Sequence, residues 1–151
     1  MGTDEAAIEE VAEAIRRAGS DRDRMRETMT GLYAEMVEIA HQPPQPSDGP
    51  VPAGVLIAMA DREVGALSRA ISEPWTDPPE VTVDGECIRV RNRMGGTLAD
   101  GTDVELATNT LYTIRAGRIV GLRSEMAPEE TQRWSSMLVA GSFEAPSEWS
   151  R

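Results

Sequence analysis

The sequence contains little of the chemistry that cysteine and histidine provide, since its 151 residues include one of each, Cys87 and His41. A single thiol excludes an internal disulfide, and without a Cys/His cluster we expect neither a metal site nor another cofactor. No apolar run approaches the ~20 residues that span a bilayer, and the acidic start MGTDEAAIEE lacks the apolar core of a secretory signal. We therefore expect a cytoplasmic protein with no membrane partner.

Positive charge is also scarce. Fifteen Lys and Arg residues stand against 26 Asp and Glu, which gives a formal net charge of −11 and a pI near 4.5. Such a surface repels phosphates, so we expect no nucleic-acid partner. Arg89, Arg91 and Arg93 form either a solvated or dimer-facing row or a small anion site. With 40% hydrophobic and 27% charged residues, the composition is that of a single folded domain over residues 1–151.

Apolar residues in the first half recur at helical spacing. A first stripe predicts a helix over residues 4–18, ended by Gly19, and consists of Ile8, Val11 and Ile15. Ser20, with Asp23 three residues later, predicts the start of a second helix. A third helix is predicted from about Pro52, and its expected buried face consists of Leu56, Ala60, Val64, Leu67 and Ile71.

After Tyr33 the apolar period changes to two, which predicts a short strand before a proline-rich loop. One face of this strand consists of Val37, Ile39 and His41. Further strands are joined by turn signals at Asp84-Gly85, Asp100-Gly101 and Ala116-Gly117, and Pro128 begins a closing helix. Helices followed by hairpins indicate an α+β fold: a curved antiparallel sheet of about four to six strands, wrapped on three to four helices and enclosing a conical cavity.

This order of elements resembles the nuclear-transport-factor-2-like superfamily, which includes ketosteroid isomerases, limonene epoxide hydrolases and polyketide cyclases of the SnoaL type. The segment YAEMVEIAHQPP is similar to the isomerase strand in which the catalytic base comes seven residues after a Tyr-Ala pair. Counting from Tyr33-Ala34, that position is His41. The stretch DGTDVELATNTLYTIRAGRIVGLRSEM resembles the paired long strands that close the fold of this superfamily.

The same resemblance also shows departures from each known active site. The isomerases' hydrogen-bonding tyrosine falls on Ala12, and their protonated aspartic acid falls near Thr110. Ser124 stands near the second aspartate of the epoxide hydrolases, whose Arg-x-Asp pair is missing from the strands, and the cyclases' aspartate falls around Met126-Ala127. The resemblance therefore implies the fold and a pocket, without implying any of these three reactions.

The expected catalytic residues are His41, Thr110 and Tyr112. An imidazole at the base position can exchange a proton near pH 7, whereas its structural alternative is a hydrogen bond to a loop carbonyl among residues 42–48. The inward hydroxyls could bind a polar substrate group, although Thr and Tyr are also ordinary strand residues.

The expected ligand-binding residues are Tyr33, Met36, Asn92, Thr108, Ser124 and Met126. Asn92 alternates with the arginines, and a bulge at Gly95-Gly96 would turn Arg91 or Arg93 inward instead and favour an anionic ligand. Glu125 is expected on the outer face, in solvent.

Together these features predict a small-molecule-binding protein. We expect an apolar, oxygenated ligand (a polyketide, terpenoid or steroid-like compound) and acid/base chemistry of the isomerase, cyclase or hydrolase type centred on His41. The alternative is a non-catalytic ligand-binding or dimerisation module of the same fold. The resemblance further implies a homodimer formed through the outer sheet face.

Overall fold

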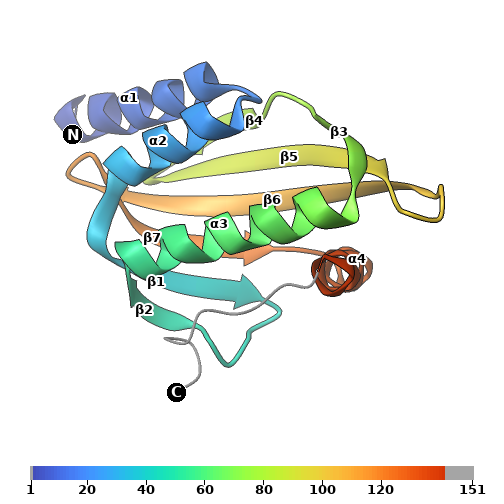
Figure 1. Cartoon of the computed structure of the whole chain (residues 1–151). Helices are drawn as coiled ribbons and strands as arrows, with labels where there is room; N and C mark the ends of the chain where they lie inside the picture. The colour runs from blue at the N-terminus through green and yellow to red at the C-terminus, as the bar shows by residue number, and fades with distance from the viewer. Residues whose placement is uncertain (1, 142–151) are drawn as a thin grey trace.

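The structure, a computed structural model, describes residues 2–141, with side chains from residue 4 onward. Within this part four helices and seven strands follow one another (Figure 1). Their order is α1 Gly2–Ala18, α2 Arg22–Leu32, β1 Tyr33–Gln42, β2 Gly49–Pro52, α3 Ala53–Ala70, β3 Ser72–Thr76, β4 Glu80–Asp84, β5 Cys87–Thr97, β6 Asp103–Arg115, β7 Arg118–Glu125 and α4 Pro128–Ala140. This confirms the predicted α+β class. No helix among the described residues is long and apolar enough to cross a membrane.

Local chemistry accounts for the helix ends. Gly19 has a φ of +60°, the left-handed conformation that ends α1 as predicted. The cap of α2 is displaced by one residue from the prediction, because the side chain of Asp21, and not Ser20, accepts the N–H of Arg24 at 3.1 Å. Pro128 occupies the first turn of α4, where its missing N–H costs no helical hydrogen bond.

The sheet differs from the predicted all-antiparallel one. Its strand order is β2-β1-β7-β6-β5-β3, and β4 also pairs with β5. β1 and β7 are parallel, while the other pairs are antiparallel. The two unpredicted strands contain proline, which removes a backbone donor and is tolerated at sheet edges. These are β2, with the sequence GPVP, and β3, with the sequence SEPWT.

α1, α2 and α3 lie on one face of the sheet, with α1 against β4 and α3 running toward α4, which lies beyond the end of β7 (Figure 1). Alternate residues of the strands face them, as the burial of Ile88 and Val90 shows. β5 pairs with β6 from Cys87 to Thr97 without a register shift, so β5 itself does not bulge at Gly95-Gly96. The irregularity opposite these glycines lies in β3, between Ser72 and Trp75. Asn92 therefore stays on the inner face, and the arginines of β5 face outward.

The buried face of α3 is rotated from the one predicted. Val64, expected inside, is 40% exposed. The buried residues of this helix are Leu56, Ala66, Leu67 and Ala70. An apolar stripe on a helix can continue by steps of either three or four residues, so the sequence is compatible with more than one buried face. The structure buries the face that contains these four residues.

Candidate functional site

The strand register brings three of the predicted residues into one row. His41 of β1 lies opposite Ser124 of β7, Ser124 lies opposite Thr110 of β6, and Thr110 lies opposite Val90 of β5. Directly opposed residues on one face are close neighbours, and Val90, which is 4% exposed, marks this face as the inner one. His41, Ser124 and Thr110 therefore share a polar row on the helix-covered side of the sheet.

His41 has an acidic partner that the sequence did not identify. Its Nδ1 lies 2.5 Å from Oδ1 of Asp48, and its backbone N–H donates to Oδ2 of the same carboxylate at 3.1 Å. Oδ2 also accepts the N–H of Gln45 at 3.0 Å. The ring thus contacts a carboxylate of the loop, and not a loop carbonyl as in the structural alternative. The available sequence signal was an Asp-Gly pair where the proline loop turns back into β2.

The electrostatics of this pair favour an ionised carboxylate. Burial alone would raise the pKa of Asp48, but the hydrogen bonds from the His41 ring and from the backbone of Gln45 and His41 lower it below its usual value. The side chains of His41 and Asp48 are 24% and 22% exposed. An ionised carboxylate at Nδ1 orients the imidazole as a Nδ1–H donor, which leaves Nε2 as the nitrogen available to a ligand.

Tyr112 lies one row away, opposite Leu122, and packs with Tyr33 against the main apolar cluster. Burial raises the pKa of Tyr112 to about 12, and burial together with the nearby Tyr112 raises the pKa of Tyr33 further. Both phenols are therefore neutral at physiological pH. Within the described part of the chain neither hydroxyl makes a hydrogen bond, so each can donate to a bound group.

Three other predicted residues line a separate hollow. A groove of about 560 Å³ lies where β7 gives way to α4, and it includes Asn92, Thr108 and Met126. Consecutive residues of β5 and β6 line it, so their backbone forms its floor. His41, Thr110 and Tyr112 do not contribute to it. Asn92 and Thr108 thus border the groove from inner-face positions of β5 and β6, whereas His41, Ser124 and Thr110 form the inner row.

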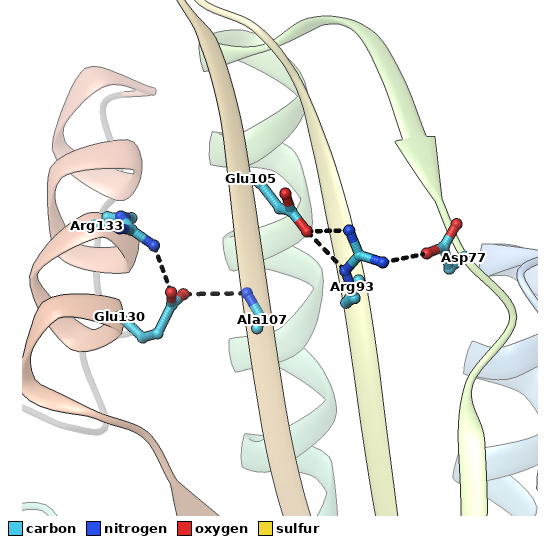
Figure 2. Close-up of polar contacts among 6 residues, drawn as sticks. All are labelled: Asp77, Arg93, Glu105, Ala107, Glu130 and Arg133. Atoms are coloured by element: carbon cyan, nitrogen blue, oxygen red, sulfur yellow. Dashed lines mark hydrogen bonds and ion pairs between the residues drawn. The ribbon is translucent and has the colours of Figure 1, made fainter.

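Charged side chains of both signs line the groove, and Figure 2 shows the contacts that some of them make. Arg93 pairs with Glu105 and reaches Asp77 at 3.4 Å. Glu130 of α4 accepts the N–H of Ala107 at 3.1 Å and also pairs with Arg133, so that α4 caps the part of β6 that β7 does not cover. The Glu130 carboxylate thus accepts a backbone N–H at the edge of β6, and α4 forms one wall of the groove.

Two expectations about outer-face residues need correction. Glu125 is on the outer face, but its carboxylate is only 27% exposed and accepts a hydrogen bond from Arg89 at 2.6 Å. The hydrogen bond from Arg89 is the main reason that the pKa of Glu125 is lowered. Met36 lies on the face of β1 opposite His41 and is 47% exposed, so the structure does not bring it to the inner row.

Comparison with solved structures identifies the fold. No protein-family model matches the sequence, and a search of curated proteins finds no match. Solved structures do match. A nuclear-transport-factor-2-like protein of unknown function from Burkholderia pseudomallei has a TM-score of 0.58 at 19% identity, covering 85% of this chain and 96% of that one.

Two further structures have named activities or ligands. TerC, co-crystallised with polyporic acid, has a TM-score of 0.56 at 18% identity, covering 88% of this chain and 98% of its own. A proposed polyketide cyclase from Xanthomonas campestris has a TM-score of 0.57 at 14% identity, covering 89% and 98%. Similarity at this level of identity establishes architecture. The chain therefore has the nuclear-transport-factor-2-like fold.

Proposed function

We propose that this protein binds a largely apolar, oxygenated small molecule against the inner face of its sheet and transfers a proton on it through His41. The contact between His41 Nδ1 and the Asp48 carboxylate carries this proposal. It holds the ring in one orientation and leaves Nε2 to accept a proton from a ligand carbon or hydroxyl. A positioned base of this kind contributes about 10²–10⁴ in rate.

The neighbouring groups suit an uncharged oxygenated ligand. Thr110 and Ser124 offer hydroxyls beside His41, and Tyr112 offers a neutral phenol in the next row. The apolar residues around them would bind a hydrocarbon skeleton. TerC, which shares the fold, was crystallised with polyporic acid, and another neighbour is a proposed polyketide cyclase. Isomerisation and cyclisation include this proton transfer from the ligand, and in hydrolysis the same base would take the proton from the attacking water.

The alternative is a binding or dimerisation module without catalysis. The position of the isomerases' tyrosine is occupied by Ala12, which is fully buried in the apolar cluster and cannot donate a hydrogen bond.

As part of the proposal, two copies of the chain pair through the outer sheet face. This face carries Arg91 and Arg93, 55% and 59% exposed, beside acidic side chains of the groove.

The experiment measures proton abstraction directly, without needing the natural substrate. We would follow deuterium exchange into the acetyl group of 2-acetonaphthone in D2O by proton NMR. The wild type should accelerate exchange, and His41→Gln should lose about 10²-fold or more of the acceleration. Asp48→Asn should also reduce it, because an amide does not hold the ring in the same way.

The matched control is Glu10→Gln, which removes a carboxylate from the exposed side of α1 and should leave the exchange rate unchanged. Equal exchange rates in wild type and His41→Gln would refute the catalytic role. In that case, binding of the ketone without exchange would support the non-catalytic alternative.

A further inference from the structure

A carboxyl group lies in the middle of the inward face of α3. Glu63 stands two turns after Leu56 and about one turn before Leu67, and both of these are buried. Residues at these spacings lie on one side of a helix. Glu63 therefore points with them toward the sheet, where an apolar residue would be the ordinary choice.

Glu63 also lies where the apolar core divides in two. Leu56 and Met59 of α3 pack in the cluster that includes Val37 and Ile39, while Leu67 and Ala70 belong to a second cluster with Leu106 and Met137. Glu63 falls between Met59 and Leu67, and so at the boundary between the clusters.

The sheet becomes polar at the same boundary. On β5, Asn92 lies between Val90 of the first cluster and Met94 of the second. On β6, Tyr112 packs with the first cluster and Leu106 with the second, and the inner-face positions between them are Thr110 and Thr108. We call Glu63, Asn92, Thr108 and Thr110 the polar band.

The members of the polar band have no partners among the residues that the structure describes. None of their side chains makes a hydrogen bond or an ion pair there. No side-chain nitrogen or oxygen of the described residues is both fully enclosed and unpaired, so the polar atoms of the band border accessible space. Donors and acceptors that meet such space without protein partners are groups that a ligand can engage.

Charges near the band do not neutralise Glu63. On the inner face of β1 the titratable side chains are Tyr33 and His41, and Asp48 contacts the His41 ring. On the inner face of β6 the titratable side chain is Tyr112. On α2, Arg26 is paired with Asp61 of α3, and Arg22 donates to Ser68. On α4, Arg133 is paired with Glu130, and Arg69 of α3 itself donates to the carbonyl of Gly141.

The physical consequence is a carboxyl that gains or loses its proton near neutrality. Burial raises the pKa of Glu63 from its ordinary 4.5 to about 7. The neutral form can donate a hydrogen bond, whereas the ionised form repels anions and attracts cations.

We propose that Glu63 binds the ligand that lies against the inner face of the sheet and selects uncharged ligands over carboxylates. Its neutral carboxyl donates a hydrogen bond to a carbonyl or hydroxyl oxygen of the ligand. Asn92, Thr108 and Thr110 bind a second oxygen from the sheet side. This rests on the proposed function and narrows its ligand to a neutral molecule with oxygens on two sides of an apolar skeleton.

Three matched probes test the selection: 2-acetonaphthone (neutral), 2-naphthoate (anionic) and 2-naphthylmethylammonium (cationic). Their dissociation constants would be measured by NMR titration at pH 5.5 and 8.5. In the wild type the ketone should bind best at pH 5.5 and about tenfold more weakly at pH 8.5, the loss expected for one hydrogen bond. Naphthoate should bind more weakly than the ketone at both values.

Glu63→Gln should remove the fall in ketone affinity between the two pH values, while Glu10→Gln should retain it. His41 is common to all three proteins, so it cannot produce a difference between them. Ketone affinity with the same pH dependence in Glu63→Gln as in wild type would overturn the role of Glu63, and so would tightest binding of the ammonium probe at pH 5.5, where the carboxyl is neutral. If none of the probes bound to the wild type, the proposed function would fail together with this inference. Ketone binding and His41-dependent exchange in the wild type would leave the proposed function standing, even where the role of Glu63 is overturned.

Discussion

Replacing Glu63 with glutamine should change how the stability of this protein depends on pH. In the unfolded chain this carboxyl has its ordinary pKa of 4.5, and in the folded protein burial raises the pKa to about 7. Below pH 4.5 both states are protonated, and the group does not affect folding. As the pH rises from 4.5 to 7, the folded state retains a proton that the unfolded state has released, so the free energy of unfolding falls. Above about pH 7 the loss is complete.

The magnitude follows from the two pKa values. They differ by about 2.5, and each pKa unit corresponds to about 1.4 kcal/mol, so the loss is about 3 kcal/mol. Glutamine has a similar shape and does not titrate. The stability advantage of Glu63→Gln over wild type should therefore increase by about 3 kcal/mol between pH 4 and pH 8. Asp48, Asp61 and Glu125 have lowered pKa values and act in the opposite direction, but they are common to both proteins and cancel.

Urea unfolding followed by tryptophan fluorescence at pH 4, 6 and 8 would measure this difference. Glu10→Gln serves as the control, because an exposed carboxyl should give a nearly constant difference from wild type. If the difference between Glu63→Gln and wild type varied by less than ~0.5 kcal/mol from pH 4 to pH 8, the burial of Glu63 argued above would be wrong.

Two further predictions concern packing and assembly. A Cβ on Gly96 would lie 2.0 Å from Cγ2 of Ile71 and 2.8 Å from the carbonyl oxygen of Ser72, so Gly96→Ala should lower the free energy of unfolding by about 1–3 kcal/mol. Gly31→Ala, on α2 with nothing within 4 Å, should raise it by up to ~1 kcal/mol, and equal effects in thermal unfolding would contradict this reasoning. Light scattering should give about twice the 16.4 kDa chain mass if the outer sheet face forms a dimer. Arg93→Glu should then shift the mass toward that of a monomer, whereas a monomeric wild type would refute the dimer.

Local patterns were sufficient to predict much of the fold. Gly19, the Asp-Gly turns and Pro128 act through the conformation of their own backbone, and they were located from the sequence within a residue or so. The parallel pairing of β1 with β7 was not predictable in this way, because it joins segments about 80 residues apart through the packing of the whole sheet. The edge strands β2 and β3 were missed because their prolines suppress the usual strand pattern.

The face of α3 shows how a local pattern can select the wrong residue. Leu56 and Leu67 fit two stripes, one through Val64 and the other through Glu63, and hydropathy favours valine. The structure takes the second stripe and leaves Val64 40% exposed. An acidic residue on a buried stripe violates the local rule, and such violations concentrate at functional sites. The disagreement between pattern and packing at this position is thus itself an observation that favours a role for Glu63.

Asp48 was missed for a different reason, since its contact with His41 depends on the path of the loop between β1 and β2. The carboxylate is held by the backbone N–H groups of His41 and Gln45 as well as by the ring. Two of its three hydrogen bonds therefore come from the main chain, and the loop fixes its orientation independently of any ligand. A base that is oriented before the ligand arrives avoids the reorganisation that a mobile imidazole would undergo during proton transfer. The proline-rich loop, which the sequence suggested only as the end of a strand, is for this reason the part of the fold on which the proposed chemistry depends most directly.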